Sequence, residues 1–232
     1  MKIAGFQKFT LVDYPGKAAA LIFLAGCNMR CPFCHNKDLV INPSKCKLIE
    51  EDGVLDYLKK RKKLLDGVVI SGGEPTLQKD LEAFLVKIKD LGYLIKLDTN
   101  GSKPEKIQEF IYKGLVDYIA MDVKNRFLKY PITIGRTDFN LSNIDKSIAI
   151  LKRGDVDYEF RTTIINELHN DEDMKELAKM LKGAKRYYLQ KFEDSDTVIK
   201  KGAFTAPSEE KMQHFIEIVK EEIPEAEIRM YL

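Results

Sequence analysis

The sequence predicts an α/β fold built on a parallel sheet. Short β-branched or apolar runs alternate at least six times with amphipathic stretches of helical period. Repeated βα units of this kind form parallel sheets through right-handed crossovers. Several of the runs are followed directly by cysteines, glycines or charged residues. These residues are therefore expected to meet at one edge of the sheet.

The expected elements follow one another along the whole chain. Strands are expected at residues 20–24, 68–71, 93–98, 117–121, 158–163 and 186–190, with a further candidate at 227–231. Helices are expected between them at residues 49–65, 80–91, 104–112, 143–151, 171–181 and 208–222. Ser208, Asn170 and Pro104 mark three of the helix starts, because capping side chains and an early proline favour a helical N-terminus.

Length and composition bound the organisation of the protein. A chain of 232 residues without a Gly/Ser-rich linker is expected to form one domain, residues 1–232. The formal net charge of +2 gives no reason to expect a nucleic-acid partner. The chain has no run of about 18 apolar residues that could span a bilayer, and no secretory h-region. The sequence thus predicts a cytoplasmic protein that binds neither nucleic acid nor membrane.

Three of the four cysteines form a candidate metal site. Cys27, Cys31 and Cys34 follow the first expected strand with the spacing C-x3-C-x2-C. Structural zinc and fully ligated iron-sulfur clusters take four protein ligands, so three clustered thiolates leave one metal position open. Cys46 lies in a polar stretch without ligand-like neighbours, and we do not expect it to be a ligand. Clustered cysteines in a cytoplasmic chain favour metal over disulfide bonds, and an iron-sulfur cluster favours an anaerobic setting.

The cysteine loop also permits two alternative interpretations, a zinc site and an electron carrier. His35 could complete a zinc knuckle, although it directly follows Cys34 and adjacent ligands usually diverge. An iron-sulfur electron carrier is the second alternative, and it would need a fourth protein ligand. The histidines His169 and His214 lack a ligand partner at helical spacing and receive no role.

Functional residue types recur at the ends of the later strands. They are Gly72, Gly73 and Glu74 after the second strand, Asp98, Thr99 and Asn100 after the third, Asp122 and Lys124 after the fourth, Arg161 within the fifth, and Gln190 at the end of the sixth. Each has an ordinary alternative as a turn or a surface ion pair. Their shared position favours function, because ligands of parallel α/β folds bind beyond the carboxyl ends of the strands.

With Phe33 before the last cysteine, the loop resembles the C-x3-C-x-aromatic-C motif of the radical S-adenosylmethionine (SAM) superfamily. The resemblance implies a partial (β/α)6 TIM-like barrel of the radical SAM type. It also implies a four-iron four-sulfur cluster on Cys27, Cys31 and Cys34, whose open iron is chelated by SAM. One electron from the cluster then cleaves SAM to methionine and a 5′-deoxyadenosyl radical, so that the cofactor carries the chemistry.

The strand-end motifs resemble one branch of that superfamily, the glycyl-radical-enzyme activases, which includes pyruvate formate-lyase activating enzyme. The Gly-Gly-Glu-Pro turn matches the turn that contacts the SAM amino group. The resemblance implies a monovalent cation site from Asp98, Thr99 and Asp122 with a backbone carbonyl near Ala120. It also implies SAM contacts from Lys124 and Arg161, while Gln190 stands where the relative has a histidine. The implied cofactor-binding set further includes Phe33, His35, Asn36 and Asn100.

The first 17 residues are expected to fold over the barrel mouth. Val12-Asp13-Tyr14-Pro15-Gly16 is similar to an activase segment whose aspartate touches a peptide substrate, so Asp13 is the candidate substrate-binding residue. Tyr14 and Lys17 depart from that segment and are more similar to proteins labelled anaerobic ribonucleoside-triphosphate reductase activating proteins.

This resemblance implies an oxidoreductase activity, the abstraction of a glycine α-hydrogen from a large partner enzyme. The implied partner is a glycyl radical enzyme such as anaerobic (class III) ribonucleotide reductase. A flavodoxin or ferredoxin is the implied reductant. A radical SAM enzyme that acts on a small molecule, similar to the deazaguanine-forming branch, is the enzyme alternative.

Overall fold

Eight strands form a single sheet in which spatial order follows chain order. The computed structural model describes residues 1–229. β1 pairs antiparallel with β2, and every later pair is parallel. No pairing joins β8 to β1 among the described residues, so the sheet is an open, partial barrel. The strands are β1 (Ile3–Thr10), β2 (Ala19–Leu24), β3 (Gly67–Gly72), β4 (Leu94–Thr99), β5 (Tyr118–Asp122), β6 (Asp157–Ile164), β7 (Tyr187–Lys191) and β8 (Ala226–Arg229).

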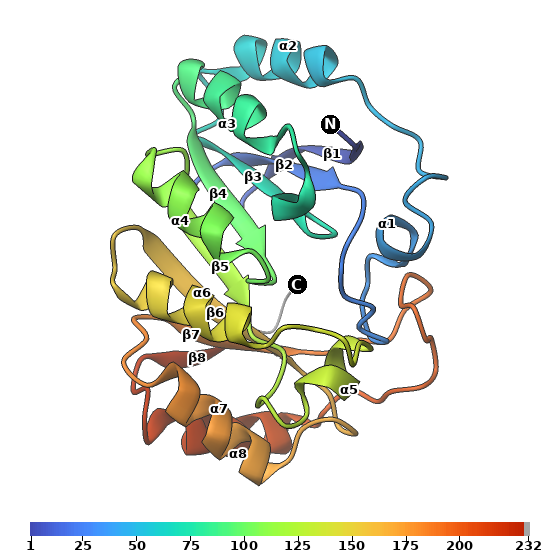
Figure 1. The fold of residues 1–232 in the computed structure, drawn as a ribbon, viewed down its shortest axis with the longest axis vertical. Helices are drawn as coiled ribbons and strands as arrows, with labels where there is room; N and C mark the ends of the chain where they lie inside the picture. The colour runs from blue at the N-terminus through green and yellow to red at the C-terminus, as the bar shows by residue number, and fades with distance from the viewer. Residues whose placement is uncertain (230–232) are drawn as a thin grey trace.

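Helices cover one face of this sheet. Figure 1 shows α2, α3, α4, α6, α7 and α8 along that face, and the short α1 and α5 on the side toward which the parallel strands point. The helices are α1 (Lys37–Ile41), α2 (Glu51–Arg61), α3 (Leu81–Asp90), α4 (Pro104–Tyr112), α5 (Tyr130–Ile134), α6 (Ser142–Lys152), α7 (Asp171–Leu181) and α8 (Glu209–Lys220), with a 3-10 turn at Pro75–Leu77. None of the helices in the described part of the chain is long and apolar enough to cross a membrane.

Most of the expected elements are confirmed within one or two residues. The helix expected at 49–65 is shorter, because the chain turns after Arg61. Asn170 caps α7 in a capping box with Asp173, and Ser208 caps α8 by accepting from the Lys211 N–H. The candidate strand at 227–231 corresponds to β8, which spans Ala226–Arg229. Residues 230–231 of this prediction lie outside the described residues. β1, α1 and α5 were not expected from the sequence.

The N-terminal segment takes a different place from the one expected. Residues 1–17 do not cover the mouth. β1 instead runs antiparallel along β2, with Ile3 opposite Leu24 and Thr10 opposite Ala19. This pairing satisfies the backbone groups that β2 would expose as an edge strand. Because β1 runs away from the carboxyl ends of the parallel strands, Asp13 and Tyr14 lie at the amino edge of the sheet.

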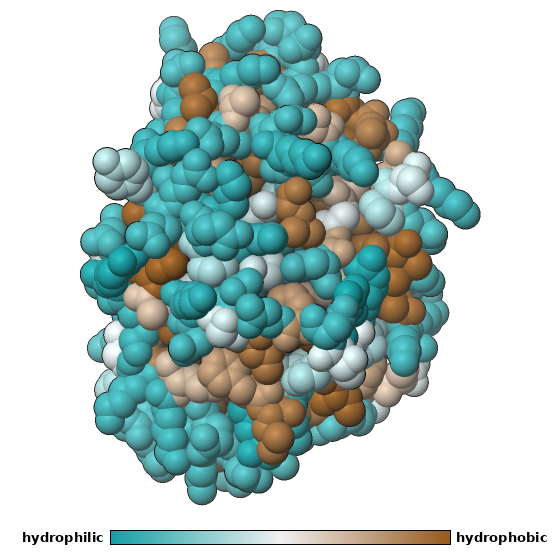
Figure 2. All heavy atoms as spheres, in the orientation of Figure 1, coloured by the Kyte–Doolittle hydropathy of each residue, from teal (hydrophilic) through white to brown (hydrophobic). Residues whose placement is uncertain are grey.

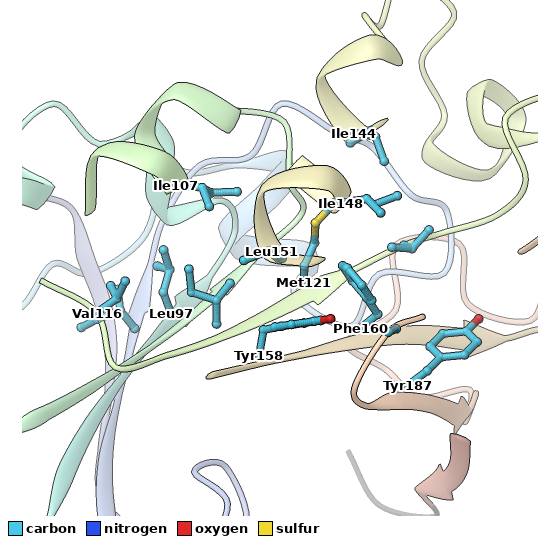
Figure 3. Packing of buried hydrophobic residues seen from close by; sticks show 14 of the residues in the cluster. Leu97, Ile107, Val116, Met121, Ile144, Ile148, Leu151, Tyr158, Phe160 and Tyr187 are labelled. Atoms are coloured by element: carbon cyan, nitrogen blue, oxygen red, sulfur yellow. The ribbon is translucent and has the colours of Figure 1, made fainter. Parts of the chain in front are cut away.

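The main core lies between the sheet and its helices. In Figure 3, Leu97, Met121 and Phe160 of three neighbouring strands pack toward Ile107 of α4 and Ile148 of α6. These side chains are at most 4% exposed, and the burial of each contributes about 1.5–3 kcal/mol. Strand alternation sends every second residue to the opposite face.

That opposite face is more mixed. It carries a smaller apolar cluster of Tyr14, Leu21, Val69, Tyr118 and Ala120. The surface of the molecule in Figure 2 is mostly polar, with smaller apolar patches between the polar side chains. The face of the sheet that lacks long helices also carries the charged side chains of Lys96, Asp98 and Arg161, so it combines apolar and charged positions.

Candidate functional site

The cysteine loop lies between β2 and α1, at the carboxyl edge of the sheet. Two distant segments hold it through backbone hydrogen bonds. The Arg30 N–H donates to the Ile134 carbonyl at the end of α5 at 2.8 Å, and the Lys200 N–H donates to the Pro32 carbonyl at 2.8 Å. The conformation of the loop therefore depends on segments about 100 and 170 residues further along the chain.

The three thiols of the loop are buried or half-buried, and two of them receive backbone donors. The Met29 N–H points at Cys27 Sγ, and the Asn36 N–H points at Cys34 Sγ, each at 3.4 Å. Burial raises the pKa of Cys27 to about 11 and that of Cys31 to about 12. These thiols are therefore neutral at pH 7 until a metal displaces their protons. N–H groups aimed at sulfur and apolar shielding fit an iron-sulfur cluster, whose potential depends on such contacts.

The structure offers no preformed set of ligands for a single metal ion. Within residues 1–229, no group of three or more His, Cys, Asp or Glu side chains lies close enough to hold one ion. The His35 ring instead lies beside Phe192, with ring centroids 5.6 Å apart. Cys46 is not part of the loop, and its thiol contacts the carbonyl oxygens of Asp38 and Asn42 at 3.5 and 3.8 Å.

The glycine turn after β3 is packed against the cysteine loop. The Gly73 N–H donates to the Leu24 carbonyl, and the Glu74 N–H donates to the Gly26 carbonyl, both at 2.8 Å. A Cβ atom at Gly73 would lie 2.0 Å from the Gly26 oxygen. Asn36 adds a side-chain bond from Nδ2 to the Gly72 carbonyl at 2.8 Å. Only residues without side chains allow these two backbones to approach so closely.

Glu74 joins two of the expected cofactor-binding turns. Its side chain has no exposed area. Oε1 accepts from the Thr76 N–H at 3.1 Å and from the Thr99 hydroxyl at 2.8 Å, and Oε2 accepts from the Asn100 N–H at 2.7 Å. Burial raises the pKa of this carboxyl group despite these donors. Both carboxylate oxygens are engaged by the protein, so Glu74 holds the β3 and β4 turns in register.

Five charged side chains, on β4 and β6 and at or just after the end of β5, form a chain of contacts that alternate in sign. Lys96 Nζ lies 2.7 Å from Asp98 Oδ1, and Arg161 Nη1 lies 3.6 Å from the same oxygen. Arg161 Nε lies 2.9 Å from Asp122 Oδ1, and Lys124 Nζ lies 2.9 Å from Asp122 Oδ2. We call this set the charged row. Its side chains are at most 28% exposed.

Neighbouring charges in the row shift the pKa values of Asp98, Asp122 and Lys124. Burial alone would raise the pKa of Asp122, but Arg161 and Lys124 outweigh it and hold the pKa at about 2. Burial likewise opposes ionisation of Asp98, and Arg161 with Lys96 brings its pKa below the usual range. The pKa of Lys124 lies above its usual value, because Asp122 and the nearby thiols outweigh its burial. Asp98, Asp122 and Lys124 are therefore charged at neutral pH.

Two residues of this region were missed from the sequence. Lys96 precedes Asp98 by two positions on a strand, so alternation alone would have placed both on one face. His169 is 2% exposed. Its Nδ1 accepts from the Ile165 N–H, and its Nε2 therefore donates to the Lys124 carbonyl at 3.1 Å. No local signal could have found this contact, because 45 residues separate the two positions.

The remaining predicted residues fall into two regions. Asn100 lies at the cysteine loop, with Nδ2 at 3.0 Å from Asn28 Oδ1 and 3.8 Å from Cys27 Sγ. Phe33 is buried in the loop, and Gln190 is 6% exposed near the end of β7. Asp13 is apart from them at the amino edge, where it accepts from the Thr10 hydroxyl. His214 forms a surface pair with Asp171 and takes no part in the site.

The sequence pattern of the radical SAM superfamily matches residues 21–181, which include the cysteine loop and the charged row. The chain belongs to the radical SAM superfamily. Enzymes of this superfamily depend on SAM and a four-iron four-sulfur cluster. The superfamily and the open barrel confirm the expected fold class and an enzymatic activity.

Individual relatives and solved structures are also similar. A Methanocaldococcus jannaschii protein, provisionally named a glycyl-radical enzyme activating enzyme, is 37% identical over 98% of this chain and 95% of its own length. A Listeria monocytogenes pyruvate formate-lyase-activating enzyme is 36% identical over 53% of each chain. The crystal structure of a radical SAM methyltransferase from Sphaerobacter thermophilus has a TM-score of 0.72 at 16% identity, covering 95% of this chain and 68% of that one. This last likeness shows the fold alone.

Proposed function

We propose that this radical SAM enzyme is a glycyl-radical-enzyme activase. The similarity over nearly the whole chain to a protein named as such an activase carries the proposal. A second support is the packing of the glycine turn directly against the three-cysteine loop, which brings the expected cluster and SAM sites together. The proposed reaction removes one α-hydrogen atom from a glycine of a partner enzyme and leaves a glycyl radical there.

When bound, the cluster would supply one electron for the cleavage of SAM to methionine and a 5′-deoxyadenosyl radical, and this radical would take the glycine hydrogen to give 5′-deoxyadenosine. The residues of the chain hold and orient the reactants. Cys27, Cys31 and Cys34 would ligate three irons and leave the fourth for the SAM amino and carboxylate groups. Backbone groups of Gly72 and Gly73 would receive the SAM amino group.

Cationic side chains would bind the carboxylate group of SAM. Lys124 and Arg161 are half-buried, and each retains donors beyond those that contact Asp122. Charge-assisted bonds from such donors to a carboxylate are stronger than neutral ones. Gln190, at the end of β7, would supply a neutral hydrogen bond to the same cofactor.

The proposed partner is an anaerobic ribonucleotide reductase, with a flavodoxin or ferredoxin as the reductant. Asp13 would contact the partner backbone at the amino edge of the sheet, away from the cysteine loop. A cavity of about 320 Å³ at the same edge is lined by Tyr14, Lys17, Asp157 and Arg186, but not by Asp13. The contact of Asp13 would therefore hold the partner outside the reaction site.

The experiment begins with anaerobic purification and reconstitution with iron and sulfide. The protein is reduced with dithionite and incubated with SAM, and 5′-deoxyadenosine is measured with and without the candidate reductase. We expect 5′-deoxyadenosine together with a glycine-centred radical in the electron paramagnetic resonance spectrum of the partner. Cleavage of SAM without that radical would reject the reductase as the partner and favour the small-molecule alternative. A loaded, reducible cluster without cleavage, even with the partner present, would favour an electron carrier.

A further inference from the structure

The three side chains that the activase resemblance assigns to a monovalent cation already have protein partners. Asp98 and Asp122 both contact Arg161, at 3.6 and 2.9 Å. The Thr99 hydroxyl donates to Glu74 at 2.8 Å and accepts from the Gly101 N–H at 3.2 Å. Both carboxylate oxygens of Asp122, Oδ1 of Asp98 and the Thr99 hydroxyl are thus engaged by donors of the same chain.

The charge of the row also disfavours another cation. Lys96, Arg161 and Lys124 are cationic, while Asp98 and Asp122 are the only anions of the row, which leaves a formal surplus of one positive charge. Two of these cations are nearly enclosed, with side chains 3% exposed at Lys96 and 12% exposed at Arg161. An added sodium or potassium ion would enter an already positive, partly desolvated region, where repulsion is weakly screened.

The nearest additional carboxylate does not alter this balance. Glu159 lies on β6 two residues before Arg161 and has no exposed area. Arg229 neutralises it through two hydrogen bonds, at 2.7 and 2.9 Å. The Tyr118 hydroxyl donates to it as well, at 2.8 Å. No charge of Glu159 is left to attract an external ion.

We infer that the guanidinium group of Arg161 is a built-in counterion that takes the place of the monovalent cation, so that SAM binding by this protein requires no sodium or potassium. A guanidinium group has five N–H donors in a fixed plane. The contacts to Asp98 and Asp122 use two of its nitrogens. The remaining donors stay available to the SAM carboxylate. This inference rests on SAM binding, but not on the glycine chemistry.

The first test uses the protein without cluster or SAM. Thermal unfolding is compared in potassium, sodium and choline chloride at equal ionic strength. We expect the same Tm for the wild-type protein in all three salts. Arg161→Ala leaves the two aspartates without their shared cation, so its Tm should be higher in potassium or sodium than in choline by about 2–4 °C.

Arg126→Ala is the matched control. It removes an arginine from the buried carboxylate of Asp173, which keeps a contact to Lys129 at 2.5 Å. The Tm of this variant should not depend on the cation. An equal salt effect in both variants would show a nonspecific response and overturn the inference. A wild-type Tm that rises with potassium or sodium would also overturn it, whether or not Arg161→Ala folds.

The second test measures SAM binding to the reconstituted protein by calorimetry. The wild-type Kd should be the same in potassium and choline chloride, whereas a tenfold tighter Kd in potassium would overturn the inference. A conservative variant, Arg161→Lys, keeps the charge but loses the planar fork. It should remain independent of the cation. Failure of partner activation would not bear on either result, because neither measurement includes the partner.

Discussion

The two edges of the parallel sheet are built from the same strands but have different contents. The carboxyl edge gathers the cysteine loop, the glycine turn and the charged row, joined by hydrogen bonds between turns. At the amino edge, Tyr14 packs near Tyr118, with ring centroids 6.0 Å apart, beside an open cavity. The turns of the carboxyl edge are thus tied together by hydrogen bonds, whereas the amino edge contains a cavity of about 320 Å³.

Direction of the strands explains this difference. Each parallel strand ends at the carboxyl edge, and loops from several strands can converge there. β1 runs the other way and brings the segment around Asp13 to the opposite edge. Changes at the carboxyl edge should therefore affect the cluster and SAM, whereas changes at the amino edge should affect only the partner. Four predictions test this division.

Cys31→Ala should have the largest effect. Removal of one of three thiols leaves too few ligands for the cluster, so iron incorporation and 5′-deoxyadenosine formation should both be lost. Cys46→Ala is the control, because that thiol contacts only carbonyls outside the loop. Iron and sulfide content and visible absorbance measure the outcome. Equal cluster content in the two variants would contradict the assignment of the ligands.

Gly73→Ala should disturb the packing of the glycine turn against the cysteine loop. Its Cβ would lie 2.0 Å from a backbone oxygen, which cannot move as a side chain could. We expect a loss of about 1–3 kcal/mol in the free energy of unfolding, with weaker SAM binding. Gly53→Ala in α2 meets nothing within 4 Å and should be neutral or stabilising. Urea unfolding measures the free energy of unfolding of both variants. Equal values for the two would contradict the prediction.

Asp122→Asn should change the response of stability to acid. The pKa of Asp122 falls from 3.8 to about 2 on folding, so its contribution is present above pH 3.8 and is lost as pH falls toward 2. The wild-type protein should lose about 2 kcal/mol more than the variant across this window. Urea unfolding from pH 5 to pH 2 measures both slopes. Asp56→Asn on the exposed face of α2 should keep the wild-type slope, and a loss of slope there would contradict the assignment.

Asp13→Asn should have the smallest effect on the cofactor site. The variant keeps an acceptor for the Thr10 hydroxyl, so the turn should persist. Cleavage of SAM should stay within about twofold of wild type, whereas formation of the partner radical should fall about tenfold, equivalent to about 1.4 kcal/mol of lost binding. Parallel assays of 5′-deoxyadenosine and the glycyl radical separate the two. An equal decrease in 5′-deoxyadenosine and in the glycyl radical would show that Asp13 affects SAM cleavage itself, and would contradict the division between the two edges.

The local pattern determined much about this protein. Alternation of strands and helices predicted seven strands and six helices, because hydrophobic period reflects local geometry. The spacing of Cys27, Cys31 and Cys34 predicted a metal-binding loop, since ligands on one short loop need no long-range information. Strand order then predicted one common edge for the later motifs, because parallel strands end on the same side.

Only the tertiary structure decided which of these residues are free to meet a ligand. Glu74 belongs to the same Gly-Gly-Glu-Pro turn as Gly72 and Gly73. Its carboxylate, however, already accepts hydrogen bonds from Thr99 and Asn100 at the end of another strand. Asp98 and Asp122 have the residue types of a cation site, yet Arg161 bridges them across two strand pairs. Pairing of β1 likewise moved Asp13 to the far edge. Hydrogen bonds and charges are satisfied by neighbours in space, which sequence spacing does not record.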